Sequence, residues 1–556
     1  MKIKTAIEYF YDWEANDPDR IFLRQPFGKE WFTFTYGQAG EQARRMIAAL
    51  QASGLKKGDH VGIYSKNCYH WIITDLAIMM GGFVSVPFYA SLPKEQLAEV
   101  VIKSDIKILF VGKLDKWADH AKGIPENVQI IRYPHYEGNA VVSEGFLWDD
   151  LISAHQAVNT HFIPELDTTW SILYTSGTTG SPKGAMLPHR SPATVMYDES
   201  KNHELGIASL KNVQLLSFLP LNHVGERIGL EMLGLLMGGT ISFVESINTF
   251  AQNLQDTQPT FFFAVPRIWI KMQKGVFESI QENVLNIIFA IPGLSGIFKK
   301  LLRKKLGFGR LKITLTGAAI TPTHVKEWYR KIGINLREVY GMTECCGSAT
   351  LTPIGEFSGD NVGKPLKGFQ LKILPETNEV LYRSSQQMTG YYKDPHKTAE
   401  VIIDGWIHSG DRGSIDDNGN LKIEGRIKDA FKTSKGLYIT PNRIEEELTK
   451  TPIIEQVCVA GLGIDQPIAL VNLSDVTKSM DKAEIEKTLK SALENINVTL
   501  NNYEKISTIV ITKDTWTDQN MLLTPTLKIR RGKIDEKYSA FYQKWQDQKG
   551  LVVWEV

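Results

Sequence analysis

Hydrophobic positions recur with two alternating periods in the N-terminal part of the chain. Between residues 38 and 53 they fall three or four apart, the spacing of one face of an amphipathic helix, and Gly54 follows where a left-handed cap would end it. Short apolar runs typical of buried strands, HVGIYS, FVSVPF and KILFVG, then alternate with helical segments at 69–80 and 94–104. This alternation predicts an α/β architecture with mostly parallel, layered sheets.

A further apolar run, WSILYT, ends at residue 175 and leads into a glycine-rich segment, and HRSPATVMYDES at 189–200 has the composition of a following helix. Strand, loop and helix in this order form an anion-binding arrangement, because the N–H groups at a helix N-terminus point at the ligand. We therefore expect an anion site between the strand and the helix.

The pattern changes to strand and turn near residue 412. The stretch GSIDDNGNLKIEGR holds an Asn-Gly pair between two alternating segments, which is a strong hairpin signal. A more polar, Lys/Glu-rich stretch with the size of a small α+β domain follows it. We therefore predict an N-terminal domain at 1–427, with a β-rich part near its end, and a C-terminal domain at 428–556.

Composition narrows the class of partner. The 556 residues carry 63 basic and 62 acidic side chains, so no global field favours nucleic acid as a partner. The four cysteines form no CxxC pair, which indicates reduced thiols in a cytoplasmic protein and neither a zinc site nor a disulfide framework. No secretory signal is evident, and the apolar run at 76–90 is too short and too interrupted to span a bilayer.

The glycine-rich segment has the chemistry of a polyphosphate site. Glycines let backbone N–H groups point inward, hydroxyls add donors and a lysine adds charge. The segment differs from a Walker loop, since Pro182 stands five residues after its first glycine. A solvated turn rich in small residues is the alternative. The candidate ligands are Thr175, Ser176, Gly177, Thr178, Thr179, Gly180 and Lys183.

The same segment, YTSGTTGSPKGAMLPH, resembles the phosphate-loop signature of the AMP-forming acyl-CoA synthetases, members of the adenylate-forming superfamily. Five further blocks follow in the family's order: TGAAI, YGMTE, DGWIHSGDRG, GRIKDAFKTSKGLYITPNRIE and TPTLKIRR. The resemblance covers nearly the whole chain. It implies the adenylate-forming fold, in which a large N-terminal domain of several subdomains is followed by a small mobile α+β domain.

The resemblance also implies a nucleotide site. Tyr340 would stack on adenine, Thr343 would contact the α-phosphate, and Glu344, with Thr175, would hold Mg²⁺, a hard cation that prefers oxygen ligands. A buried tyrosine and a surface glutamate are the alternative for this block. The small residues that would let the flat base approach the backbone are Gly317, Ala318, Ala319 and Gly341.

Five further positions complete the expected site. Asp411 would accept the two ribose hydroxyls with Arg426 as a second contact, although an Asp-Arg couple is also a common surface ion pair. Lys528 would bridge the negative charge that develops during adenylation, unless it is only one residue of a basic run. Lys428 occupies the hinge position where many family members carry Asp, and Gly436 would help build the thioester-forming face.

The acid substrate is inferred from two blocks. FLPLNHVGER and GYYKDPHKTAEVIIDGWIHSGDRG are similar to long-chain fatty acyl-CoA synthetases, which places His223 near the acyl-AMP and leaves Glu226 and Arg227 to pair structurally. The expected activity forms acyl-AMP from a fatty acid and ATP, and then acyl-CoA from coenzyme A. The alternatives are another carboxylic acid, a carrier-protein phosphopantetheine as acceptor, or a catalytically inactive nucleotide- or acyl-binding protein.

One segment suggests a location as well. Residues 285–312 combine an apolar stretch with the basic run KKLLRKKLGFGR, which could rest on an anionic membrane. A solvated helix face beside a core helix is the alternative. The expected partners are therefore the fatty acid, ATP and CoA, with peripheral contact at the inner face of a membrane, for a cytoplasmic monomer or homodimer.

Overall fold

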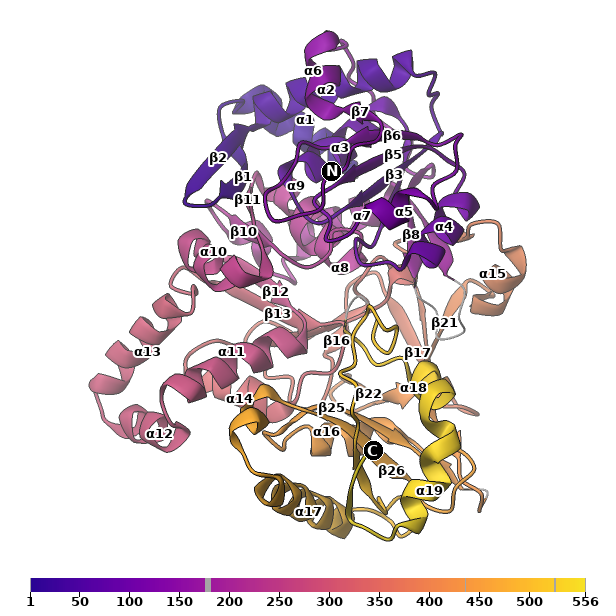
Figure 1. Cartoon of the computed structure of the whole chain (residues 1–556). Coiled ribbons are helices and arrows are strands. Elements are labelled where there is room, and N and C mark those ends of the chain that lie inside the picture. The colour runs from indigo at the N-terminus through magenta and orange to yellow at the C-terminus, as the bar shows by residue number, and fades with distance from the viewer. Residues whose placement is uncertain (1, 176–181, 436, 525–526, 556) are drawn as a thin grey trace.

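The structure is a computed structural model that describes residues 2–175, 182–435, 437–524 and 527–555. Six predicted ligands lie outside the described residues: Ser176, Gly177, Thr178, Thr179, Gly180 and Gly436. In Figure 1 the N-terminal residues, in indigo and purple, lie at the top, residues 266–331, in pink, lie at the lower left, and the C-terminal residues form a lower unit in orange and yellow.

The largest sheet has eight strands in the spatial order β19-β9-β8-β4-β3-β5-β6-β7 (Figure 1). They are β3 (His60–Ser65), β4 (Val84–Phe88), β5 (Ile106–Gly112), β6 (Gln129–Arg132), β7 (Phe146–Leu147), β8 (Thr169–Thr175), β9 (Lys183–Pro188) and β19 (Gly390–Tyr391). All pairs are parallel except β8 with β9 and β9 with β19. The sheet therefore ends in two antiparallel strands on the side of the predicted phosphate site.

Two further sheets complete the parallel layers. The order β10-β11-β1-β2 is made by β1 (Ile21–Phe27), β2 (Glu30–Thr35), β10 (Gln214–Ser217) and β11 (Thr240–Phe243). The order β12-β13-β14-β15-β16 is made by β12 (Phe261–Ala264), β13 (Ile313–Gly317), β14 (Arg337–Tyr340), β15 (Thr350–Leu351) and β16 (Lys364–Pro365). Because β12, β13 and β14 are parallel, Gly317 and Tyr340 end their strands at one edge.

Helices cover these sheets and fill the space between them. Helix α3 (Tyr69–Gly81) is buried at every residue after the first, as a core helix is, whereas α4 (Lys94–Lys103) buries only one face. The others are α1 (Ala6–Asn16), α2 (Tyr36–Ala52), α5 (Ala118–Ala121), α6 (Trp148–Ala154), α7 (Arg190–Asn202), α8 (Val224–Glu226), α9 (Leu233–Met237), α10 (Phe250–Thr257), α11 (Pro266–Ser279), α12 (Glu282–Ala290), α13 (Leu294–Lys305), α14 (Thr323–Lys331) and α15 (Pro395–Val401).

The β-rich part consists of β17-β18-β21-β20 with β22 paired to β21. Its strands are β17 (Gln370–Leu374), β18 (Glu379–Arg383), β20 (Ile402–Ile403), β21 (Trp406–Ile415) and β22 (Leu421–Arg426). The predicted Asn-Gly hairpin is confirmed, because β21 and β22 are antiparallel and Gly419 in the turn has φ +81°, a left-handed conformation that suits glycine.

The C-terminal unit has its own hydrophobic cores on the two faces of the sheet β25-β26-β27-β28. Its elements are β23 (Phe431–Lys432), β24 (Tyr438–Ile439), α16 (Pro441–Leu448), β25 (Ile454–Ala460), β26 (Ile468–Leu473), α17 (Lys482–Thr499), β27 (Ile509–Ile511), α18 (Arg531–Tyr538), α19 (Tyr542–Asp547) and β28 (Val552–Trp554). The chain enters this unit through a single 3-10 turn, η5 (Ile427–Asp429). The domain boundary at 427/428 stays a prediction.

Local predictions compare well with the observed elements, with one error. Helices α2, α3 and α4 lie where the hydrophobic spacing placed them, and Gly54 after α2 has φ +87°. The strand-loop-helix arrangement expected around residues 175–183 is wrong, since β9 intervenes before α7 and pairs antiparallel with β8. The phosphate segment therefore joins two strands, and α7 does not present its N-terminus there.

Among the described residues, no helix combines the length and the apolar content needed to cross a bilayer. The four cysteines are free and buried. Within the same residues, no group of three or more His, Cys, Asp or Glu side chains could hold a metal ion.

Candidate active site

The two ends of the phosphate segment meet in the sheet. Thr175, the last residue of β8, lies opposite Lys183, the first residue of β9, and its hydroxyl donates to the Lys183 carbonyl at 3.5 Å. The Lys183 ammonium lies 5.8 Å from the centre of the Tyr391 ring. Burial lowers the pKa of Lys183, and repulsion from nearby lysines, Lys428 among them, lowers it further, while attraction to Glu344 opposes the shift. The cation thus faces the same space as the candidate metal ligand.

Glu344 is fixed by the edge of the large sheet. It lies in the short 3-10 helix η4 (Thr343–Cys345), where its carboxylate is buried and accepts a hydrogen bond of 2.6 Å from the Tyr391 hydroxyl. Tyr391 belongs to β19, which pairs with β9. One tyrosine therefore joins Lys183 and Glu344, and Thr343 lies at the start of the same short helix.

The structure also pairs the two predicted ribose ligands. Asp411 in β21 lies directly opposite Arg426, the last residue of β22, and the Arg426 Nε to Asp411 Oδ1 distance is 2.7 Å. The other carboxylate oxygen accepts from the Tyr340 hydroxyl, also at 2.7 Å. Burial, and secondly the Asp411 charge, raise the pKa of Tyr340 well above its usual range, so the phenol stays a donor. Arg426 and Tyr340 thus each contact one carboxylate oxygen of Asp411 and fix its orientation. Both hydroxyls of a ribose could donate to a carboxylate held in this way.

Small residues line the approach to Tyr340. A Cβ added to Gly317 would lie 2.5 Å from the Val339 carbonyl oxygen, and one added to Gly341 would lie 2.5 Å from the Gly347 carbonyl oxygen. Neither position has room for a larger residue. Ala318 has φ +67°, which turns the backbone sharply at the end of β13, next to the exposed Ala319.

Lys528 reaches this site from the C-terminal unit. It closes a turn in which the Thr524 N–H donates to the Lys528 carbonyl at 2.7 Å and the Lys528 N–H donates to the Thr524 hydroxyl at 3.0 Å. The residue keeps solvent exposure, yet neighbouring protein displaces part of the hydration of its ammonium group, which lowers its pKa to about 8. Repulsion from Arg426 adds to this shift, and attraction to Asp411 and Glu344 opposes it.

His223 faces the same lysine from the large domain. It is the N-cap residue of α8, and its Nδ1 accepts a hydrogen bond of 3.1 Å from the Gly225 N–H. Burial, and secondly the charge of Lys528, lower the pKa of His223 to about 4. The imidazole is therefore neutral near pH 7, and a neutral ring beside a cation suits a gating role better than proton donation.

The expected pairing of Glu226 with Arg227 is wrong, although both side chains are structural. Glu226 accepts from the Phe218 N–H at 3.0 Å. Arg227 is fully buried and pairs instead with Asp75 at 2.5 Å and with Glu231 at 3.4 Å. The two side chains therefore support different parts of the core, which their adjacent positions in the sequence could not reveal.

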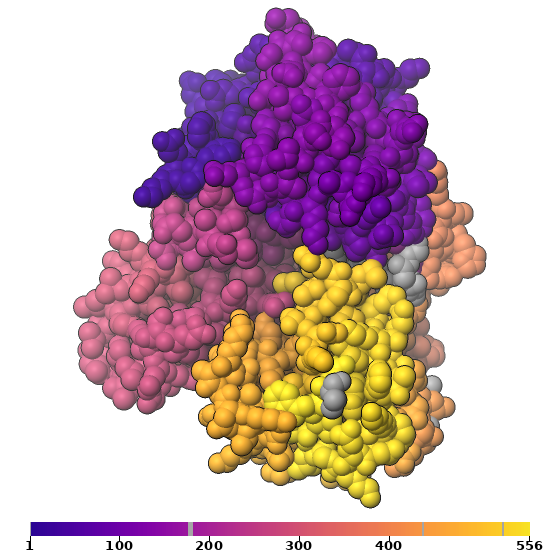
Figure 2. Space-filling view, viewed as in Figure 1, coloured from indigo at the N-terminus to yellow at the C-terminus, as the bar shows by residue number. Residues whose placement is uncertain are grey.

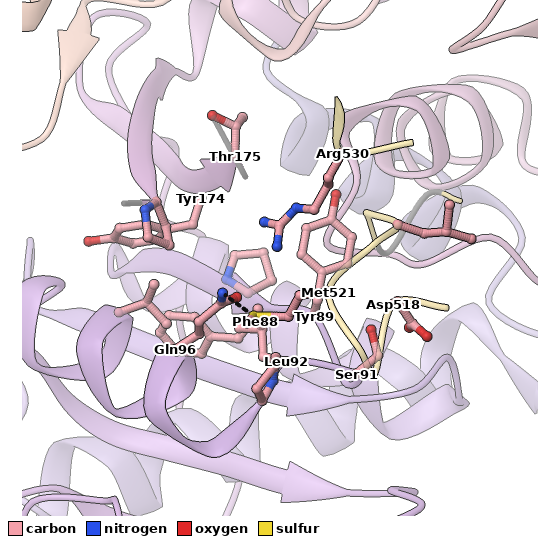
Figure 3. Close-up of a pocket in the computed structure, with 15 residues that line it drawn as sticks. Phe88, Tyr89, Ser91, Leu92, Gln96, Tyr174, Thr175, Asp518, Met521 and Arg530 are labelled. Atoms are coloured by element: carbon pink, nitrogen blue, oxygen red, sulfur yellow. Dashed lines mark hydrogen bonds between the residues drawn. The ribbon is translucent and has the colours of Figure 1, made fainter. Parts of the chain in front are cut away.

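A small pocket lies where the C-terminal unit meets the phosphate hairpin (Figure 3). Tyr174 and Thr175 line one side, and Met521 and Arg530 line the other. Figure 3 shows the Arg530 guanidinium directed into this pocket, and burial lowers its pKa. The Gln96 amide donates to the Met521 sulfur at 3.2 Å across the same boundary. The two units are therefore in contact beside the expected triphosphate position.

The sequence did not identify Tyr391 or Arg530 as site residues. Tyr391 lies in the quoted block GYYKDPHKTAE, where an aromatic pair after glycine was the available signal. Arg530 lies two residues after Lys528 in the basic run, where nothing distinguished it from its neighbours. Lys428 is exposed in η5, at the entry to the C-terminal unit.

Comparison with known proteins places the chain in a family. Residues 10–392 match the AMP-binding enzyme family, and residues 428–545 match the AMP-binding enzyme C-terminal domain. The long-chain-fatty-acid–CoA ligase FadD15 of Mycobacterium bovis is 28% identical, with 95% of each chain covered. Long-chain-fatty-acid–CoA ligase 1 of Homo sapiens is 29% identical, over 93% of this chain and 83% of the human protein.

A solved structure agrees with the fold. The A domain of carboxylic acid reductase from Segniliparus rugosus, in complex with AMP and a co-purified carboxylic acid, superimposes with a TM-score of 0.80 at 21% identity, over 99% of this chain and 95% of that one. This confirms the predicted α/β fold with its small C-terminal unit. Since the first family match alone covers more than half of its length, the chain belongs to the AMP-binding enzyme family.

Proposed function

We propose that the protein is an AMP-forming fatty acid–CoA ligase. It would convert a fatty acid and ATP into acyl-AMP and pyrophosphate, and then acyl-AMP and CoA into acyl-CoA and AMP. Family membership and the names of the similar proteins support this activity. The observation that carries it is the position of Lys528, whose ammonium is attracted by the Asp411 and Glu344 carboxylates and whose charge lowers the pKa of His223.

The first step needs charge stabilisation more than proton transfer. A carboxylate oxygen of the acid attacks the α-phosphorus, a new O–P bond forms, and the bond to the bridging oxygen of pyrophosphate breaks. Negative charge grows between two anionic groups, and a preorganised cation there lowers the barrier. Lys528 is proposed as that cation, while Asp411 would hold the ribose and Thr343 the α-phosphate.

Magnesium would be held by Glu344, with Thr175 as a second candidate. The buried carboxylate of Glu344 is a hard oxygen donor with one oxygen engaged by Tyr391. The described residues offer no three-ligand cluster, which fits Mg²⁺ because this ion usually takes one or two carboxylates and completes its shell with phosphate oxygens and water. Bound there, the ion would neutralise the phosphates. Tyr391 would fix the carboxylate direction.

The second step requires a thiol where Lys528 now stands. The CoA sulfur would attack the acyl carbonyl, and the carbon–oxygen bond to AMP would break. We propose that the C-terminal unit rotates about η5, with Lys428 at the pivot, so that Lys528 withdraws and the face around Gly436 approaches. The single turn that joins the two units supports this proposal, since a few residues at an element end can absorb such a rotation.

Separate half-reactions test the assignment. Lys528→Ala should lose ATP–pyrophosphate exchange by about 100-fold or more and still convert supplied acyl-AMP and CoA to thioester. Lys533→Ala, which removes a lysine paired with Glu536 in α18, is the matched control and should keep both rates. An equal fall in both half-reactions of Lys528→Ala would remove Lys528 from the adenylation step.

The substrate class is tested by the same exchange assay. Acids of increasing chain length should give exchange, whereas an aryl or short polar acid as the best substrate would favour the alternative ligase. Replacing CoA by a carrier-protein phosphopantetheine separates the two acceptors. The absence of exchange with every acid tested would favour a catalytically inactive nucleotide- or acyl-binding protein.

Location and assembly also stay proposals. We propose a cytoplasmic monomer or homodimer that contacts the inner face of a membrane through residues 285–312. The exposed surface of that segment supports the membrane contact.

A further inference from the structure

Helices α12 and α13 follow one another in the chain, contact each other and project from the body of the molecule (Figures 1 and 2). One face of this pair is anchored in the core around Trp269, where Leu285 and Leu302 are buried. The rings of Phe289 and Phe298 meet between the helices with centroids 6.1 Å apart. The pair is therefore held by its inner face and needs no partner to complete it.

Its outer face is apolar and open to solvent. The exposed fractions are Ile287 63%, Ile291 43%, Leu294 47%, Ile297 63% and Leu301 60%. On α13 the last three fall three and four residues apart, so they form one stripe along the helix. Single exposed hydrophobic residues need no explanation, whereas a contiguous group on a projection marks an interaction surface. We call these five residues the apolar stripe.

Unpaired positive charge surrounds the apolar stripe. Residues 283–312 contain seven basic and no acidic side chains, in a chain whose net charge is only +1. None of the seven forms an ion pair with any carboxylate in the described part of the chain. Helical geometry places Lys300, Lys304 and Lys305 on the flanks of the α13 part of the stripe, since they lie within four residues of Ile297 and Leu301. The projection thus carries apolar groups between cations.

We propose that this face docks on an anionic phospholipid bilayer, with the apolar stripe in the acyl boundary and the lysines at the lipid phosphates. Amphipathic helices with this distribution of residues bind membrane interfaces because they bury apolar side chains and because their basic side chains are attracted to anionic lipids. A second copy of the chain is a poorer occupant, because a two-fold contact would bring seven positive charges of each protomer together without acids between them. The docking argument stands on the surface alone; its use for substrate capture rests on the proposed function.

Vesicle flotation with the full-length protein, without ATP or acid, tests the proposal. The protein should float with vesicles of phosphatidylcholine and phosphatidylglycerol at low ionic strength, and should be released by high salt or by omission of the anionic lipid. Neutralising the triple set Lys300→Gln, Lys304→Gln and Lys305→Gln should weaken the partition coefficient on the order of 100-fold, at about fivefold per lysine. Ile297→Ser with Leu301→Ser should abolish the binding that resists salt.

A matched control removes three lysines elsewhere. Lys482→Gln, Lys487→Gln and Lys490→Gln lie on α17 and change the net charge equally, and this variant should float like the wild type. Equal loss in both triple variants would show a net-charge effect and overturn the proposal. So would wild-type binding that is indifferent to anionic lipid, or a dimer in sedimentation analysis that only Ile297→Ser with Leu301→Ser dissociates. Exchange activity with a water-soluble acid should be unchanged in all variants, which separates this result from the proposed function.

Discussion

The lowered pKa of Lys528 predicts an alkaline limit for the adenylation step. The ammonium form is needed, and a pKa of about 8 leaves roughly nine tenths of the lysine charged at pH 7, one tenth at pH 9 and one hundredth at pH 10. The value of kcat/KM for ATP should therefore be level below pH 8 and fall about tenfold per unit above it. Bound ATP adds negative charge, so the limit in kcat should lie at higher pH.

Two variants assign this limit. Lys528→Arg carries a guanidinium that does not titrate in this range, so whatever exchange activity it keeps should lack the alkaline limb. Arg426→Gln removes a repelling neighbour and should move the limb upward, because Arg426 lowers the pKa of Lys528. The assay measures the rate of ATP–pyrophosphate exchange from about pH 6 to about pH 10. A limb that persists unchanged in Lys528→Arg would refute the assignment.

The remaining predictions concern the metal, the ribose and the core. Glu344→Gln should lower exchange about 100-fold and raise the magnesium concentration required, and Tyr391→Phe should have a smaller effect of the same kind; a normal magnesium titration would contradict both. Asp411→Asn should raise KM for ATP roughly 10- to 100-fold through loss of charged hydrogen bonds, and an unchanged KM would exclude the ribose role. Arg227→Ala should lower the free energy of unfolding in urea by about 3–5 kcal/mol, because it leaves the buried carboxylate of Asp75 without its cation; a loss below about 1 kcal/mol, the size typical of an exposed pair, would contradict this reasoning.

Local signals in the sequence were sufficient for much of the fold. The turn at Gly419 and the cap at Gly54 depend on a few adjacent residues, and α3 shows its burial directly in its composition. The β9 strand could not be read in this way, because its six residues KGAMLP owe their extended form to pairing with β8 on one side and β19 on the other. The spacing of hydrophobic residues within a segment does not reveal which distant strand that segment pairs with.

The same limit applies to the site. Tyr340 and Asp411 are 71 residues apart and were each assigned by their motif blocks, but the hydrogen bond between them was not foreseen. Tyr391 and Glu344 are 47 residues apart, and neither motif indicates that one orients the other. Motifs name the groups that contact a ligand. The side chains that hold those groups in place come from strand order and register, which only the structure supplies.

Arg426 has two positions at once, as the partner of Asp411 and as the last strand residue before η5. The proposed ribose contact therefore lies directly beside the proposed pivot. A rotation about residues 427–429 would leave Arg426, which precedes the turn, with the N-terminal part of the chain, and would move Lys528, which follows the turn, with the C-terminal unit. In the proposed cycle the nucleotide would therefore keep its ribose contacts while the C-terminal unit exchanges the face that it presents to the nucleotide.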